Sequence, residues 1–252
     1  MIEHSAHPQG MPAQAAQPTP RARRAVRDPE VLNTLNRERI RAMMEASRPV
    51  TPQDPAGLYL QAYGMDAKRI KTMGHVLRYA PAETYWGRGS EAPTSTHPAL
   101  LAVLSNKDTT TTDLPPQLLR VYLTERGTLA PVATPIKRSG CHMPNPGAAI
   151  RLGAPALIDG ARCLGVAVGL PQALQASRCT GLPVWAVLDM ESISALHFPR
   201  KTPLDHLHIF TYTPGCFQVK ELARKAQAFG IKAIVCPQPS PQNINTESTA
   251  TP

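Results

Sequence analysis

From about residue 150 onward, short apolar runs alternate with segments of helical spacing, and no other pattern in the sequence restricts the fold as strongly. Apolar runs of about 4–8 residues are typical of buried strands, and apolar residues three and four positions apart are typical of helices. A strand–helix repeat of this kind predicts a mostly parallel sheet with helices packed on it. The expected strands cover residues 164–168, 184–188, 206–210 and 231–235.

The carboxyl ends of these strands are the first place to look for a functional site, because ligands of parallel sheets bind beyond those ends. The ends are Val168-Gly169, Asp189-Met190-Glu191 and Thr211-Tyr212-Thr213. The carboxylates of Asp189 and Glu191 could share a metal ion. They could equally mark the start of a helix, where acidic side chains interact favourably with the helix dipole.

A pair of histidines could also ligate a metal. His206 and His208 alternate on one face of an expected strand, but a metal site needs a third ligand that the sequence does not locate. The cysteines are five in number and include no Cys-x-x-Cys pair. This usage indicates a reducing cytosol and argues against both a disulfide framework and a zinc ribbon.

The first half of the chain has a different pattern. A helix is expected from Asp28-Pro29 to about Ser47, because proline is favoured at the first helical position. A second short helix is expected over 56–63. Strands are expected at 99–104 and 118–123, the second followed by the hairpin signal Glu125-Arg126-Gly127. The Gly-, Pro-, Ser- and Thr-rich stretches 84–98 and 105–117 are expected to be loops.

These patterns predict four segments: a disordered tail over 1–27, a basic α+β module over 28–150, an α/β domain over 151–238 and a second disordered tail over 239–252. Both tails are rich in proline and polar residues and cannot bury enough apolar surface to offset their chain entropy. No apolar run reaches the roughly 18 residues of a membrane span, and the N-terminus lacks the apolar stretch of a signal peptide. We therefore expect a cytoplasmic protein that does not interact with membranes.

The formal net charge is +9, and the excess is concentrated in residues 31–80, which carry eight basic and four acidic side chains. Such an excess favours attraction to phosphate backbones, although an ordinary solvated helix surface would look the same. Trp86 lies in the same half of the chain, close to Tyr85 and Arg88, and could stack on a single-stranded base or belong to the core. The candidate nucleic-acid-binding residues are Arg37, Arg39, Arg41, Lys68, Arg69, Lys71 and Arg78.

The stretch LGVAVGLPQALQASRCTGLPVWAVLDMESISAL resembles the opening of the Toprim domain in primase-like proteins of phages, plasmids and integrative elements. The upstream segments TPQDPAGLYLQAYGM, HPALLAVL and KRSGCHMPNPGAAIRLG are similar to the module that precedes Toprim in those proteins. The resemblance covers roughly residues 30–238. It implies an α/β fold: a Toprim-like Rossmannoid parallel sheet preceded by a smaller α+β primase-associated module.

The resemblance also implies catalytic positions, and this sequence lacks the acids expected there. The glutamate that ends the first Toprim strand corresponds to Val168. The Asp-x-Asp pair of the third strand corresponds to the Thr211-Tyr212-Thr213 segment, and Thr211 and Thr213 match the two aspartates best. No Asp or Glu occurs between Asp205 and Glu221. Metal-assisted phosphoryl transfer needs carboxylate oxygens to hold Mg²⁺, and these residues cannot supply them.

The sequence therefore predicts a catalytically inactive, Toprim-containing, primase-like protein of a bacterial mobile element. Its expected partners are single-stranded or primed DNA and a replication or helicase protein, and no cofactor is expected. Two other hypotheses remain open. One is an active primase-type nucleotidyltransferase that holds Mg²⁺ with Asp189 and Glu191, and the other is a protein-interaction module without affinity for nucleic acid.

Overall fold

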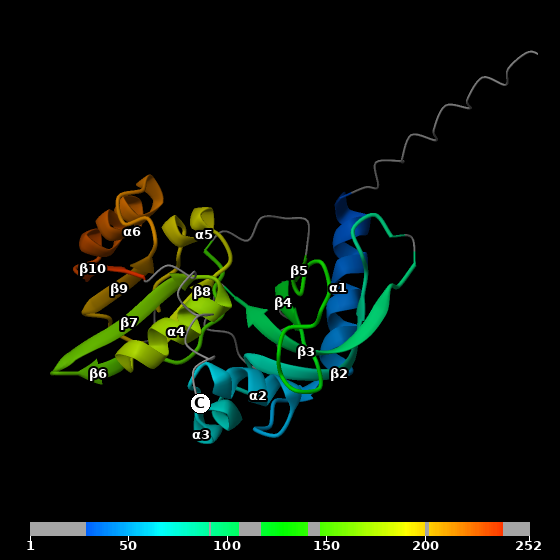
Figure 1. Ribbon diagram of the computed structural model, residues 1–252. Helices are drawn as coiled ribbons and strands as arrows, with labels where there is room; N and C mark the ends of the chain where they lie inside the picture. The colour runs from blue at the N-terminus through cyan, green and yellow to red at the C-terminus, as the bar shows by residue number, and fades with distance from the viewer. Residues whose placement is uncertain (1–28, 91, 106–116, 141–146, 200–201, 239–252) are drawn as a thin grey trace, which may run out of the picture.

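The structure is a computed structural model that describes residues 29–90, 92–105, 117–140, 147–199 and 202–238. Within these residues the chain forms two five-stranded sheets and six helices, arranged side by side as a mixed α/β molecule (Figure 1). The two predicted tails, 1–27 and 239–252, lie outside the described residues. No helix in the described part combines the length and apolar character that crossing a bilayer requires.

The N-terminal sheet is antiparallel throughout, with strand order β1-β2-β3-β4-β5. The prediction of a loop over 84–98 is wrong at both ends, because β2 extends to Tyr85 and β3 begins at Ser95. Pro98 lies inside β3, opposite a bulge in β2 where the register shifts between Ala80 and Glu83, and this irregularity accommodates the missing N–H group. The strands are β1 (Arg48–Pro49), β2 (Leu77–Tyr85), β3 (Ser95–Leu104), β4 (Gln117–Tyr122) and β5 (Ile136–Gly140).

Helices cover both faces of this sheet. Helix α1 (Pro29–Glu45) buries Ile40 and Met43 against one face. Helix α2 (Pro55–Ala62) packs on the other face together with the short helix α3 (Ala67–Thr72). The predicted helices at 28–47 and 56–63 are confirmed. Helix α3 was not predicted, and it begins where the Asp66 side chain accepts a hydrogen bond from the Arg69 N–H.

The C-terminal sheet places β7 between β9 and β8, and β10 lies beyond β9. These four strands are parallel, as predicted. The sheet is nevertheless mixed rather than wholly parallel, because the unpredicted strand β6 pairs with the start of β7 in an antiparallel hairpin. Asp159 turns this hairpin with a φ of 49°. The strands are β6 (Ala156–Ile158), β7 (Ala161–Val168), β8 (Val184–Val187), β9 (His206–Thr211) and β10 (Lys232–Pro237).

The helices of this half lie on opposite faces of the sheet. Helix α4 (Leu170–Thr180) packs on one face, whereas α5 (Met190–Ser194) and α6 (Phe217–Ala228) belong to the core on the other. From β7 the chain continues to β8, which pairs with one edge of β7. It then crosses back to β9, which pairs with the opposite edge of β7. The strand order therefore reverses between β7 and β9, which is where doubly wound sheets bind ligands.

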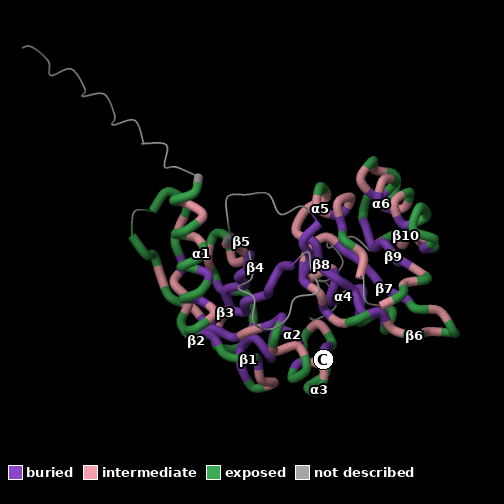
Figure 2. Tube along the Cα trace, turned by 180° about the vertical axis from the view of Figure 1, so that it is seen from behind, coloured by how far each residue is buried: buried purple, intermediate pink, exposed green. Residues whose placement is uncertain are grey.

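One of the hydrophobic clusters spans the two halves. It contains Leu60 of α2, Ile70 of α3 and Leu100 of β3 together with Leu174 of α4 and Ala186 of β8. Figure 2 shows buried segments in both halves, among them β3 and β8. The segment that joins the halves also pairs with both, through isolated bridges from Ala149 to Ser105 and from Ile150 to Ala186. The N-terminal half is not the smaller of the two as predicted, since its elements span 29–140 against 156–237.

Candidate nucleic-acid interface

A polar pocket opens between α1 and the strands β4 and β5, with a volume of about 150 Å³. Ile40 and Met43 supply its apolar wall. The other side chains that line it are polar and can donate hydrogen bonds. The polar residues that line it are Asn36, Arg39, Arg120, Arg138 and Ser139.

Arg120 is the most buried of these polar residues. Only 7% of its side chain is exposed, and its Nη1 donates to Glu83 Oε1 at 2.9 Å. Arg120 Nε and Ser139 Oγ are buried, and neither has a hydrogen-bond partner in the part of the chain that the structure describes. A buried polar group without a partner costs about 1–3 kcal/mol. Both atoms are shielded from solvent, so neither is open to a ligand in the pocket.

Arg39 adds a second cation at the mouth of the pocket, where its residue is exposed. Glu83 neutralises one of the two charges contributed by Arg39 and Arg120, which leaves a net positive pocket. Arg138 also lines the pocket, but its Nη1 lies 3.8 Å from Asp189 Oδ2. The pocket thus contains one arginine that is paired with Glu83 and another that is exposed, and this arrangement could bind an anion.

Arg37 and Arg41 are exposed on α1, but they do not line the pocket among the residues described. Helix α1 also carries three acidic side chains, which equal its three arginines in number. The helix as a whole is therefore electrically balanced, and its basic character is local. A count over 31–80 does not reveal this balance, because that range also contains the basic residues that follow α1.

The remaining predicted binding residues divide into two kinds. Lys68 and Lys71 are exposed on α3. Arg69 donates to Ser177 Oγ at 2.9 Å and to the Leu152 carbonyl at 3.1 Å, which ties α3 to the C-terminal half. Arg78 donates to Ser47 Oγ and to the carbonyls of Ser47 and Met44, and so caps the end of α1. Both guanidinium groups donate hydrogen bonds within the fold, so neither Arg69 nor Arg78 is assigned to the candidate nucleic-acid interface.

An aromatic side chain lies next to the basic strand β5. Trp86 is 37% exposed, whereas Tyr79 and Tyr85 are buried in the core. Lys137 of β5 donates to the Trp86 carbonyl and places its Nζ 3.9 Å from the centre of the Tyr85 ring. The fold therefore holds an exposed indole beside a strand that also lines the arginine pocket. Exposed aromatics beside cations are the usual platform for unstacked bases.

At the carboxyl edge of the C-terminal sheet, the ends of β7 and β9 are neighbours, as expected. Ala167 is opposite Phe210 in the register, so Val168 and Thr211 come next. Thr211 is buried and its Oγ1 accepts from the Thr213 N–H at 3.1 Å. Tyr212 and Thr213 are exposed. This edge therefore presents a valine, hydroxyl groups and backbone, and no carboxylate from either of the two strand ends.

Asp189 and Glu191 follow β8, on the other side of β7. Asp189 caps α5, because its Oδ1 accepts from the Ser192 N–H at 2.8 Å. Its Oδ2 faces Arg138 as described above. Glu191 is exposed in the first turn of α5. Both residues thus lie at the start of a helix, which was the alternative to a metal-binding role.

Sequence reasoning did not single out Arg120 and Ser139 as binding residues. The available signal was an arginine within the otherwise apolar strand 118–123, because a buried cation requires an acceptor. The pocket itself could not be anticipated, since it depends on how α1 crosses β4 and β5.

Comparison with protein families shows that residues 34–152 match the model of a domain of unknown function, DUF7146. The match includes most of α1, the whole antiparallel sheet and the segment that joins the two halves. Comparisons with curated proteins and with solved structures gave no match.

Proposed function

We propose that this chain binds single-stranded or primed DNA through the pocket of Arg39 and Arg120, as an accessory protein of DNA replication in a bacterial mobile element. The observation that carries the proposal is a pocket of net positive charge lined by Arg39, Arg120 and Arg138. An arginine guanidinium matches the geometry of a phosphate group better than any other side chain. A backbone phosphate in the pocket would accept hydrogen bonds from the exposed Arg39.

The exposed Trp86 supports a single strand rather than a duplex as the preferred ligand. Bases of a single strand can stack on an exposed aromatic ring, whereas paired bases cannot. Lys137, which contacts the Trp86 carbonyl, is adjacent along β5 to the pocket residues Arg138 and Ser139. One nucleotide could thus place its phosphate in the pocket while a neighbouring base lies on the indole.

We further propose that the C-terminal half is a Toprim-like platform without catalytic activity. The support is the chemistry of its carboxyl edge, where Val168 and Thr211 stand at the reversal point of the strand order. A two-carboxylate metal site cannot be built from these side chains. Asp189 is already engaged as a helix cap, which favours the inactive form over the one that uses Asp189 and Glu191.

Fluorescence anisotropy with labelled single-stranded DNA, measured over a salt series with and without Mg²⁺, tests the binding proposal. Each phosphate contact to a single strand contributes a slope of about 0.7 in log K against log salt. Arg39→Gln should therefore weaken binding and reduce the slope by about 0.7. Arg224→Gln is the matched control, because Arg224 is 73% exposed on α6 and pairs only locally with Glu221.

Three outcomes would contradict the proposal. Absence of binding by the parent protein at low salt would favour a protein-interaction module. Equal losses in the Arg39 and Arg224 variants would show that binding is a general charge effect. Template-dependent nucleotide incorporation that disappears in an Asp189→Asn, Glu191→Gln double variant would establish the active, metal-dependent enzyme instead.

A further inference from the structure

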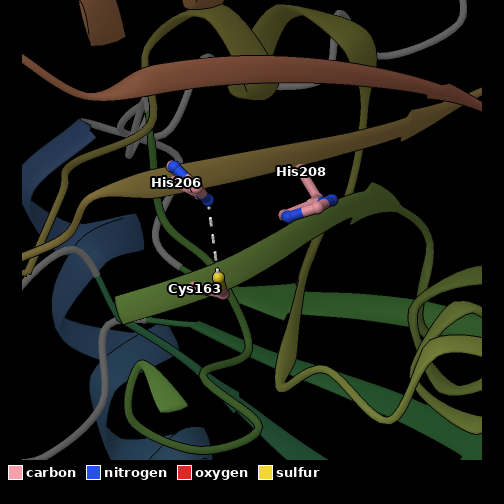
Figure 3. Close-up of side chains that lie close together, drawn as sticks. All are labelled: Cys163, His206 and His208. Atoms are coloured by element: carbon pink, nitrogen blue, oxygen red, sulfur yellow. Dashed lines mark hydrogen bonds between the residues drawn. The ribbon is translucent and has the colours of Figure 1, made fainter. Parts of the chain in front are cut away.

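Three side chains with metal-binding atoms lie together on one face of the C-terminal sheet. They are Cys163 of β7 and His206 and His208 of β9 (Figure 3). One ligand atom from each lies within 4.8 Å of the corresponding atoms of the other two. Cys163 Sγ is 3.9 Å from His206 Nδ1. The third ligand that the two histidines needed is thus a cysteine more than 40 residues earlier in the chain.

The strand register explains this proximity. Cys163 is directly opposite His206, and His208 projects to the same side because side chains alternate along a strand. The residue opposite His208 is Gly165, and the space above it is filled by the side chains of Phe210 and Val184. The His208 ring is stacked on Phe210, with ring centres 6.4 Å apart and planes 19° from parallel. Packing of Phe210 over Gly165 therefore helps to position the His208 imidazole.

Asp205 and Asp159 lie close enough to Cys163 for their negative charges to act on its side chain, and these carboxylates would favour a nearby cation. Coordination of a divalent metal would release the thiol proton to solvent.

We propose that Cys163, His206 and His208 form a zinc site. One thiolate and two imidazoles are a ligand set that Zn²⁺ prefers. Zn–N and Zn–S bonds of about 2.0–2.3 Å in a tetrahedron place ligand atoms about 3.3–3.8 Å apart. Separations of up to 4.8 Å need a contraction of at most about 1.5 Å, which side-chain rotation can provide. Cys236 Sγ of β10 lies 3.8 Å from His208 Nδ1 but is not within 4.8 Å of all the other ligand atoms, so this thiol would complete the tetrahedron only after its side chain moves.

The position of the site indicates a structural role. His206 is the first residue of β9, and Cys163 lies in the first half of β7, so the metal would sit near the amino ends of the strands. The carboxyl edge, where substrates of such sheets bind, is at the other end. Zinc would therefore fasten β9 to β7 and stabilise the fold without entering any reaction.

The test uses the full-length protein, stripped of metal with a chelator under reducing conditions and then reloaded with Zn²⁺ or with Co²⁺ as a spectroscopic probe. We expect one equivalent of zinc to remain after desalting. The Co²⁺ form should show a thiolate-to-metal charge-transfer band and the visible absorption of a tetrahedral site. Zn²⁺ should also raise the thermal unfolding midpoint.

Cys163→Ser should weaken the charge-transfer band, and its combination with Cys236→Ser should abolish it; His206→Asn and His208→Asn should abolish stoichiometric binding. Cys179→Ser and His75→Asn, at exposed positions on α4 and after α3, are the matched controls and should behave as the parent. Substoichiometric zinc in the parent, or a parent Co²⁺ spectrum without a thiolate band, would overturn the proposal even if the variants fail to fold. Unchanged binding in any of the three ligand variants would also overturn it.

Discussion

Replacing Arg69 by methionine should destabilise the fold without changing how DNA affinity depends on salt. The guanidinium group of Arg69 spans from α3 to the C-terminal half, where it donates to Ser177 and to the Leu152 carbonyl. Methionine keeps the length and apolar stem of the side chain but removes both donors. The variant therefore separates a structural role of this arginine from the binding role that its charge suggested.

The expected loss can be worked out from the two bonds. A hydrogen bond from a charged donor contributes about 1.5–3 kcal/mol to stability. Ser177 keeps its own donor bond to the Leu182 carbonyl at 2.6 Å, so its hydroxyl stays partly satisfied. The Leu152 carbonyl loses the partner that Arg69 provided. Allowing for the burial of the methionine thioether, we expect a destabilisation of about 2–4 kcal/mol.

Urea denaturation, followed by circular dichroism, measures this loss. Lys68→Met is the matched control, because Lys68 is the exposed neighbour on the same helix and should change stability by no more than about 0.5 kcal/mol. A double-mutant cycle with Ser177→Ala should give a coupling energy of about 0.5–3 kcal/mol. If Arg69→Met is no more destabilising than the control, or if it lowers the salt slope of DNA binding, the structural role assigned to Arg69 is wrong.

Four further predictions concern separate parts of the molecule. Asp54→Asn should destabilise the protein near neutral pH by about 1–3 kcal/mol, because hydrogen bonds to the carboxylate outweigh its burial and hold its pKa below the usual range. Above the unfolded pKa of about 3.9 this contribution is complete, and it disappears as pH falls through the folded pKa, so the stability curves of parent and variant should converge in acid. Gly57→Ala should cost at least about 3 kcal/mol in denaturant titrations, since the new Cβ would lie 2.0 Å from the Thr51 carbonyl oxygen. Trp86→Ala should reduce single-strand affinity by about 1–3 kcal/mol with an unchanged salt slope, and an altered slope would argue against stacking. The parent and Val168→Glu should both fail to incorporate nucleotides on a template, because a single restored acid cannot replace groups that act together; incorporation by the single variant would refute this.

The parts of the fold that the sequence predicted are those where burial leaves a local pattern. The run Val184–Leu188 is apolar because helices cover both faces of the sheet. Segments where the burial pattern is weak were missed. Helix α3 is mostly polar and is fixed by the cap at Asp66 and by the buried Ile70. Ser95–Pro98 extends β3 despite its proline, because a bulge in the neighbouring strand absorbs the irregularity.

The candidate sites were less predictable, because each one depends on pairing between distant segments. Two histidines on one strand were visible, but the position of Cys163 beside them follows from the register of β7 against β9. Arg39 was visible as a basic residue, whereas its convergence with Arg120 follows from the crossing of α1 over the sheet. Charge counts in the sequence also could not show that Arg69 and Arg78 bond within the fold.

The core shared by the two halves has a consequence for synthesis on the ribosome. The face of the N-terminal sheet that carries Leu100 and α2 is completed by α4 and β8, which are translated later. At about 5–20 residues per second, translation from residue 150 to residue 188 takes about 2–8 s. During that interval the finished antiparallel sheet exposes an apolar surface next to the ribosome. We expect the nascent chain to engage a holding chaperone until Val187 has emerged, and ribosome profiling of chaperone-bound chains should show release after that point.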